Sequence, residues 1–395
     1  MNWKRRFVRN WGRLGMKYKE YRFEEITVNY DRLRVPLSSM QRKEKKGDYR
    51  YYGAQGVIDY VDDYIFDGEY LLIAEDGENL KSKKQNIAQI ATGKFWVNNH
   101  AHILQTNSHC ELRYLYYLIN SMDLSGYITG SAQPKLSQMN MNKIPLIVPS
   151  IDEQNKILAI VGTIDGKIEE NNAINNNLLE QVLTLYRNRF IDIVNDERRI
   201  CRADEYFDIS IGKTPPRKEP QWFSTNPQDV TWVSISDMGT CGLYISSSSE
   251  QLTREAVERH NVKIVPDNTV LLSFKLTVGR IAITNGEMTT NETIAHFKTD
   301  KKEINEYLYC YLKCFNYQTM DSTSSIATAV NSKIIKGMPF VVPTDDELID
   351  FHSVAAPMFA KIKANQTESK NLTAVRDTFL PKLMSGELDV SEIDL

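Results

Sequence analysis

The chain has 395 residues, 42% of them hydrophobic and 25% charged, and its formal net charge is −3. This length allows two or three domains with separate cores, and no apolar run approaches the roughly 20 residues that span a bilayer. The five cysteines show no paired spacing, which favours a reducing, cytoplasmic setting over a disulfide scaffold.

The near-neutral total hides an uneven charge distribution. Residues 1–50 contain 15 Lys/Arg and 6 Asp/Glu, whereas residues 51–80 contain eight acids and no Lys or Arg. A local basic face is therefore possible, although a solvated charged surface explains the pattern as well.

The first fifteen residues form a separate basic segment. Apolar side chains recur there at helical spacing among basic ones: Trp3, Phe7, Trp11 and Leu14. This pattern is typical of an amphipathic helix for a partner, a phosphate backbone or a membrane surface. The alternative is an extension that precedes a natural start at Met16.

A first globular region is expected over residues 16–149. Short β-rich runs at 70–74 and 95–97 predict strands, and a helix is predicted at 112–120. A long helix follows over 150–195. It begins with Ser150-Ile-Asp-Glu153 directly after a proline, which is the pattern of a capping box.

The second half repeats this order. A globular region over residues 196–343 contains β-rich runs at 230–234 and 270–274 and a predicted helix at 304–315. A second long helix over 344–384 starts with the same type of cap, Thr344-Asp-Asp-Glu347, and residues 385–395 form a tail.

The two halves share a phrase at a fixed distance. Pro145-Leu-Ile-Val-Pro149 and Pro339-Phe-Val-Val-Pro343 are 194 residues apart, and Ala101-His102 matches Ala295-His296 at the same offset. A repeat of this length indicates two copies of a globular unit plus a helix. The sequence therefore predicts an α+β fold with two mixed α/β domains, two long helices and a pseudo-twofold internal repeat.

Apolar residues recur along both helices in steps of three and four, the coiled-coil period. Such a stripe needs a partner, so we expect an antiparallel coiled coil, while the alternative is that each helix packs on its own domain. Pro357 is expected to kink or interrupt the second helix. The predicted seam residues are Ile157, Ile160, Ile164, Ile168, Asn171, Leu178, Leu185, Phe351, Val354, Met358, Ile362, Asn365, Leu372 and Phe379.

No complete catalytic or metal-binding motif is visible. Gly212-Lys213-Thr214 imitates the end of a phosphate-binding loop, but two prolines follow where a helix should begin. His100, His102, His109 and Cys110 match no standard zinc spacing, and Cys310 and Cys314 suit core packing. Glu75 and Asp76 are interpreted as a solvated loop at an Asp-Gly turn. We therefore expect no metal and no cofactor in this chain.

Clusters of Arg, Lys, Asn, Gln and hydroxyl side chains near predicted loops are suited to reading nucleic acid, because they match base edges and phosphates. Any single one of them is more often structural or solvated than in contact with a base. The candidates in the first half are Arg34, Ser38, Arg42, Tyr51, Tyr52, Gln55, Lys94, Asn98, Asn99, Gln133 and Lys135. The candidates in the second half are Lys213, Thr214, Arg217, Lys275, Thr277, Arg280, Asn291, Ser324, Ser325 and Thr328.

At these residues the chain resembles the specificity subunits of type I restriction–modification systems. The resemblance covers residue 16 to the end. The matching phrases are Tyr51–Tyr60, Gly68–Gly77, Trp96–His102, Ala132–Leu136, Gly212–Arg217, Trp232–Met238, Ser273–Arg280, Asn291–His296 and Leu380–Leu388.

The resemblance implies two target-recognition domains, each reading one half of a bipartite DNA site, and two helices that separate them and dock methyltransferase subunits. Restriction subunits would complete the nuclease. S-adenosylmethionine, ATP and Mg²⁺ would then belong to the partner subunits, and this chain would be non-catalytic.

Two other functions stay open from the residues alone. The chain could be a self-sufficient DNA methyltransferase or nuclease, against which the missing motifs argue. It could also be a coiled-coil scaffold that does not touch DNA. Salt-dependent binding to a duplex separates a scaffold from a DNA reader.

Overall fold

The computed structural model describes residues 18–83, 85–193, 195, 198–320 and 331–390. The basic segment 1–15 and the candidates Ser324, Ser325 and Thr328 lie outside these residues. Two compact units are present: Met1–Lys167 with Asn371–Leu395, called here the first unit, and Ile168–Lys370, called the second unit. Within the described ranges, no helix combines the length and the apolar character that crossing a membrane requires.

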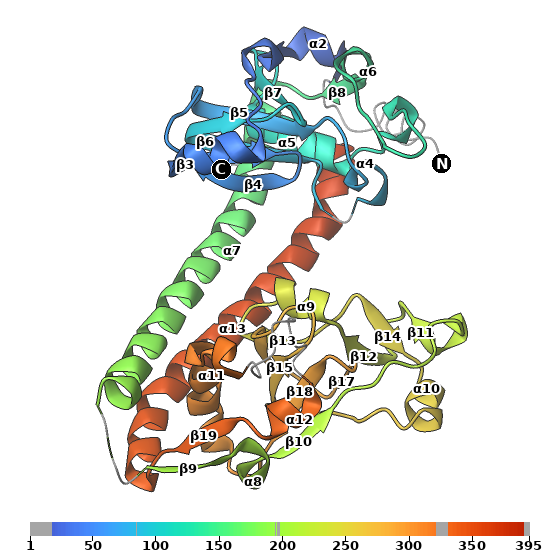
Figure 1. Cartoon of the computed structure of the whole chain (residues 1–395). Helices are drawn as coiled ribbons and strands as arrows, with labels where there is room; N and C mark the ends of the chain where they lie inside the picture. The colour runs from blue at the N-terminus through green and yellow to red at the C-terminus, as the bar shows by residue number, and fades with distance from the viewer. Residues whose placement is uncertain (1–17, 84, 194, 196–197, 321–330, 391–395) are drawn as a thin grey trace. The chain divides into compact units, whose positions relative to one another are not determined.

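The first unit is built on a six-stranded sheet with the order β2-β7-β5-β6-β3-β4 (Figure 1). Its strands are β2 (Thr27–Asn29), β3 (Lys46–Gly53), β4 (Gly56–Val61), β5 (Phe66–Ala74), β6 (Ala88–Val97) and β7 (Ala101–Thr106). Its shorter helices are α2 (Phe23–Ile26), α3 (Ser39–Glu44), α4 (Asn79–Ser82), α5 (Leu112–Ser121) and α6 (Gln138–Asn142). The predicted strands at 70–74 and 95–97 and the predicted helix at 112–120 are confirmed.

Both faces of the central strand β5 are buried. Leu71 and Ile73 pack in a core with Leu115 and Leu118 of α5, while Leu72 points to the other face and packs with Phe95. Because successive side chains of a strand alternate between faces, a run of apolar residues is the pattern of a strand covered on both sides. The run at 70–74 is continuously apolar because β5 is covered on both faces.

The second unit contains a five-stranded sheet, β10-β18-β15-β16-β13, and a four-stranded sheet, β11-β14-β12-β17. The strands are β10 (Asp208–Ile211), β11 (Phe223–Ser224), β12 (Val230–Val233), β13 (Tyr244–Ile245), β14 (Glu250–Leu252), β15 (Val270–Ser273), β16 (Ile281–Thr284), β17 (Thr289–Thr290) and β18 (Ile294–Lys298). The helices are α8 (Ala203–Tyr206), α9 (Ile235–Thr240), α10 (Arg254–Arg259), α11 (Asn305–Cys314) and α12 (Ser332–Lys336). Cys310 is buried in the main core and Cys314 packs against it, as expected.

A small two-stranded sheet occurs in each unit. In the first unit β1 (Lys19–Arg22) pairs antiparallel with β8 (Pro145–Val148), and in the second β9 (Arg199–Arg202) pairs with β19 (Pro339–Val342). In both cases a short helix follows the first strand, and the backbone N–H of Arg22 or Arg202 donates to a glutamate three residues later. The repeated proline phrase therefore forms the same local structure twice.

A long helix follows each of these sheets: α7 (Ile151–Tyr186) after β8 and α13 (Asp345–Met384) after β19 (Figure 1). Both predicted capping boxes are confirmed, because Ser150 N donates to Glu153 Oε2 at 3.0 Å and Thr344 N donates to Glu347 Oε2 at 3.0 Å. Helix α7 ends earlier than the predicted 150–195 and continues into a π-helical turn, Arg187–Ile191.

The expected interruption at Pro357 is wrong, because α13 runs through it as one helix, Asp345–Met384. Pro357 cannot donate a hydrogen bond to the carbonyl of Ser353, four residues before it. Both residues lie on the exposed side of the helix. Water can therefore satisfy the freed carbonyl, and the helix continues.

Within the second unit, the end of α7 and the start of α13 contribute to one core. Val182, Leu183 and Tyr186 pack in the same cluster as Phe351, Ala355, Phe359 and Ile362. Asn365 Nδ2 donates to Asn175 Oδ1 at 2.9 Å, and Asn171 Nδ2 donates to Glu368 Oε2 at 2.8 Å. In the first unit, Arg376 Nη1 donates to Asp165 Oδ1 at 2.8 Å.

Burial agrees with the predicted seam positions for part of them. Ile157, Asn171, Phe351, Ile362 and Asn365 are buried, as expected. Val354 and Phe379 are 38% and 44% exposed, so their predicted burial is wrong. The buried stripe passes instead through Ala355 and Phe359, one position later than the predicted Val354 and Met358. The remaining predicted positions are half-buried: Ile160, Ile164, Ile168, Leu178, Leu185, Met358 and Leu372.

Candidate nucleic-acid interfaces

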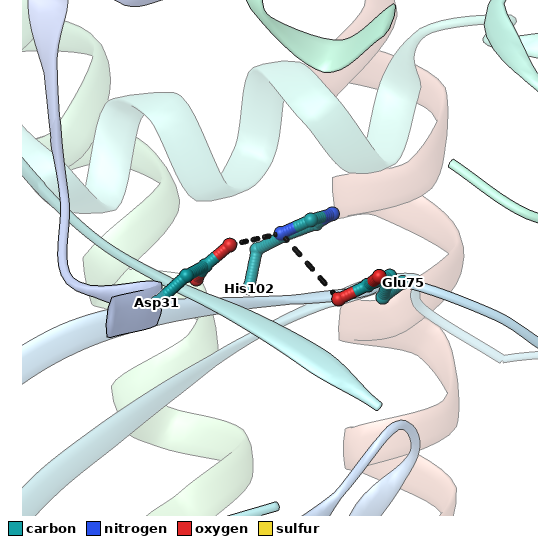
Figure 2. Close-up of side chains that lie close together, drawn as sticks. All are labelled: Asp31, Glu75 and His102. Carbon is teal, nitrogen blue, oxygen red and sulfur yellow. Dashed lines mark hydrogen bonds and ion pairs between the residues drawn. The ribbon is translucent and has the colours of Figure 1, made fainter. Parts of the chain in front are cut away.

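In the first unit, Asp31, Glu75 and His102 meet at the end of the sheet. Asp31 lies in a short 3-10 turn after β2, Glu75 directly follows β5, and His102 lies on β7. Figure 2 shows the His102 ring between the two carboxylates, with Nδ1 2.6 Å from Asp31 Oδ2 and 3.9 Å from Glu75 Oε2. His102 Nε2 lies 2.8 Å from the carbonyl oxygen of Leu136. Both ring nitrogens of His102 therefore face acceptor oxygens.

Two cations neutralise the acids of this cluster. Arg34 Nη1 lies 2.7 Å and Lys135 Nζ 3.1 Å from the Glu75 carboxylate. Burial opposes ionisation of Glu75, but the bonds and charges of Arg34, His102 and Lys135 lower its pKa overall. The pKa of Asp31 is also lowered, because the His102 contact and the bond from Ile103 N outweigh its burial.

Three acidic and histidine ligands so close together could in principle hold a metal ion, and among the described residues only this group has that geometry. A divalent cation would have to displace Arg34 and Lys135 and replace the contact between His102 Nδ1 and Asp31. The residues present therefore fit an internal ion-pair network better than a metal centre.

This network corrects the interpretation of Glu75 and Asp76 as a solvated loop. The Glu75 side chain is only 14% exposed, and Asp76 Oδ2 lies 2.8 Å from His100 Nδ1. The sequence reading missed Asp31 and Glu75 as partners of His102. The contacts of the Asp31 carboxylate with His102 and Ile103 N reach 71 and 72 residues along the chain, so no local spacing could reveal them.

The network also gathers several predicted candidates on one surface. The segment that carries Gln133 and Lys135 is held by Leu136 N, which donates to Glu75 O at 2.8 Å, and by Gly77 N, which donates to Pro134 O at 3.1 Å. Arg34 Nη1 donates to Asn99 O at 3.4 Å. A β-carbon at Gly77 would lie 3.9 Å from Gln55 Nε2. Five candidates from segments that are distant in sequence therefore lie close together: Arg34, Gln55, Asn99, Gln133 and Lys135.

The other candidates of the first unit serve the fold. Tyr51 and Tyr52 are 0% and 5% exposed, so the predicted contact of their rings with a ligand is not available in this structure. Arg42 bonds Asp59 at 3.0 Å and lies over the Tyr51 ring. Ser38 caps α3, Lys94 lies over the Tyr64 ring, and Asn98 is buried.

In the second unit, a first group of candidates surrounds the ends of β12 and β17. Lys213 N donates to Thr290 O at 2.9 Å, and Trp232 Nε1 donates to Lys213 O at 3.2 Å. Arg217 lies over the Trp232 ring at 4.6 Å and forms two bonds to Glu250, at 2.9 and 2.8 Å. Thr214 bonds Glu292, and Asn291 caps its own turn.

The second group lies on the loop between β15 and β16. Arg280 Nη1 donates to Ile235 O at 2.6 Å, and Lys275 Nζ lies over the Phe274 ring at 5.6 Å. Thr277 lies between them, next to Leu276, whose side chain is 95% exposed. Leu276 lies within the phrase Ser273–Arg280 that carries the resemblance, but it is not among the predicted DNA-contact candidates.

Comparisons with known proteins agree with this architecture. The family model described as "Type I restriction modification DNA specificity domain" matches residues 17–180 and again residues 197–353. A putative type I restriction enzyme specificity subunit of Haemophilus influenzae is 26% identical over 301 residues, which is 73% of this chain and 74% of that protein. A type I specificity subunit of Methanocaldococcus jannaschii is 27% identical over 312 residues, 71% of this chain and 70% of that protein.

The fold is also found in a solved structure. The S subunit of a type I restriction–modification system from M. genitalium superimposes with a TM-score of 0.55 at 13% identity, covering 93% of this chain and 96% of that one. The family model covers most of the chain in two separate matches. The chain therefore belongs to the family of type I restriction–modification DNA specificity subunits.

Proposed function

We propose that this chain selects the DNA site of a type I restriction–modification complex, with each unit reading one half of a bipartite sequence. The observation that carries the proposal is the double match of one DNA-specificity domain, over residues 17–180 and 197–353. Two copies of a reading domain with different loop residues can address two different half-sites.

The polar surfaces of the two units support this reading. In the first unit, Gln55, Asn99, Gln133 and Lys135 are exposed or half-buried around the Asp31–Glu75–His102 network. In the second, Lys275 and Thr277 occupy an exposed loop. Amide side chains suit adenine edges, and lysine suits guanine edges or phosphates.

The two long helices are proposed to pair as an antiparallel coiled coil and to dock methyltransferase subunits. Three side-chain bonds support antiparallel pairing: Asp165 with Arg376, Asn171 with Glu368, and Asn175 with Asn365. As the position along α7 rises, the position along α13 falls. Buried asparagine pairs of this kind fix the register of a coiled coil.

Catalysis is assigned to partner subunits. In this proposal S-adenosylmethionine binds the methyltransferase, and ATP and Mg²⁺ bind the restriction subunit. The ionisable cluster of the first unit is closed by its own cations, which agrees with a structural role.

The experiment compares the purified chain with the reconstituted complex. Alone, the chain should bind duplex DNA in a salt-dependent manner, and it should transfer no methyl group from labelled S-adenosylmethionine. With its methyltransferase it should support methylation at two short fixed sequences separated by an unspecified spacer. Methylation or cleavage by the purified chain alone would contradict the proposal.

A further inference from the structure

Leu276 combines two features that a folded protein normally avoids. Its side chain is 95% exposed, and the next most exposed large apolar residue among those described, Met40, is 72% exposed. Its backbone φ is +61°, in the left-handed region that leucine rarely adopts. Either feature alone is common at a loop tip. Their combination in one residue suggests that the exposed side chain has a function.

The loop around Leu276 is fixed by hydrogen bonds. Ser273 Oγ donates to Thr277 O at 2.6 Å and accepts from Arg280 N at 3.0 Å. Thr277 N donates to Lys275 O at 2.7 Å across Leu276, and Gly279 N donates to Ser273 O at 3.0 Å. The exposed leucine is therefore held outward by its own turn.

The loop that carries Leu276 contains basic residues and no acidic one. Between Asp267 and Glu287 the sequence contains no acidic residue, and Lys275 and Arg280 flank the tip. Phe274 N donates to Thr293 O at 3.0 Å, which joins this loop to the turn that carries Asn291. In a DNA duplex the phosphates lie outside and the stacked bases inside. An apolar loop tip flanked by basic side chains can therefore face the bases with its tip and the phosphates with its flanks.

We propose that Leu276 is a wedge that inserts between two base pairs of the half-site read by the second unit, while Lys275 contacts the adjoining phosphate. Apolar side chains that enter the base stack in this way unstack one step and bend the duplex. Pyrimidine–purine steps open most easily, so Leu276 would also favour such a step at this position. The proposal rests on the proposed function and adds to it a named specificity residue.

The key variant is Leu276→Gly in the full chain, assembled with its methyltransferase. Glycine accepts positive φ without strain, so this variant should melt at the same or a higher temperature than the wild type. Its affinity for the specific duplex should fall roughly tenfold or more, the scale of one buried leucine side chain. A structural role for Leu276 could not raise stability and lower affinity together.

The second readout is base unstacking. A duplex with 2-aminopurine at successive positions of the half-site should show a fluorescence increase at one step on binding of the wild type. Leu276→Gly and Leu276→Ala should lose this increase, and Leu276→Met should keep it. Ile264→Ala, which removes a side chain that is 52% exposed in the same unit, should leave both affinity and fluorescence unchanged.

Wild-type affinity and fluorescence in Leu276→Gly would overturn the wedge while leaving the proposed function intact. A failure of Leu276→Gly to assemble with the methyltransferase, with duplex binding by the chain unchanged, would overturn it in favour of a protein contact. If the wild-type complex bound no duplex at all, the proposed function would fail as well.

Discussion

His102 and His296 stand at equivalent places of the repeated phrase but have different neighbours. His102 contacts the Asp31 carboxylate and the Leu136 carbonyl, so it is surrounded by acceptors. His296 lies 3.0 Å from Ser210 Oγ and 2.7 Å from Thr290 Oγ1, two hydroxyls that suit a neutral ring. The same residue type thus joins an ion network in one unit and a neutral hydrogen-bond pair in the other.

The neutral state of His296 predicts a pH effect. Its burial, helped by the charge of Lys298, lowers its pKa from 6.5 to about 3. The unfolded ring binds a proton below its own pKa, and the folded ring does not. The stability that this site contributes is therefore complete above pH 6.5 and is lost as the pH falls toward 3.

In urea unfolding at a series of pH values, the wild type should lose up to about 1.4 kcal/mol of additional stability per pH unit in this window. His296→Gln cannot take up the proton, so its unfolding free energy should depend less steeply on pH. Equal slopes for both proteins would show that the folded structure tolerates a charged ring at this position.

The residue scale also shows how far the sequence could predict the site. His100 and His109 are exposed, whereas His102 and His296 are buried, each on a strand between apolar neighbours. Their partners could not be predicted, since Ser210 and Asp31 are distant in sequence and reach the rings only through strand pairing. For the same reason Tyr51 was predicted as a surface reader although it lies in the core.

At the scale of elements, the caps of the two long helices are equivalent in sequence but not in surroundings. Glu347 caps α13 and also receives Arg198 Nη2 at 2.7 Å and Asn195 Nδ2 at 2.9 Å. Burial acts to raise its pKa, but these bonds lower it to about 2. The Arg198 side chain is only 6% exposed, and Glu347 is the acid that pairs with it.

Glu347→Gln should therefore reduce the unfolding free energy by about 2 kcal/mol, because a buried guanidinium loses its counter-charge. The matched control is Glu153→Gln at the cap of α7, where Glu153 bonds Ser150 N and Oγ. Glutamine can also fill this position of a capping box, so Glu153→Gln should cost about 1 kcal/mol or less. Similar losses in the two variants would mean that Arg198 gains little from Glu347.

The helices themselves were predicted well because their signals are local: a capping box, a preceding proline and a regular apolar period. The sequence did not predict which residues form the buried stripe. A shift of one position replaces Val354 with Ala355 and hardly changes the apolar period. Packing decides this choice. The small side chain of Ala355 lies in the core with Phe351 and Phe359.

At the scale of the whole molecule, the repeat predicted two copies of one design, and the double family match agrees with it. The individual sheets could not be predicted. The first unit has one six-stranded sheet where the second has separate five- and four-stranded sheets. Such differences depend on strand pairing over long sequence distances. They give the two units different loops on a common order of elements.

The central claim is that the two units choose the half-sites independently while the helices set the distance between them. Four residues inserted between Lys167 and Ile168, and four more between Lys370 and Asn371, lengthen each helix by about 6 Å. At 3.4 Å per base pair this corresponds to about two base pairs. The insertions leave the loops of both units unchanged.

The direct measurement is to sequence the methylated sites in cells that carry the complete complex, with either the wild-type chain or this double insertion. The account predicts the same two half-sequences in both cases and a spacer longer by one or two base pairs with the insertion, at about 3.4 Å per pair. An unchanged spacer, or altered half-sequences, would contradict it.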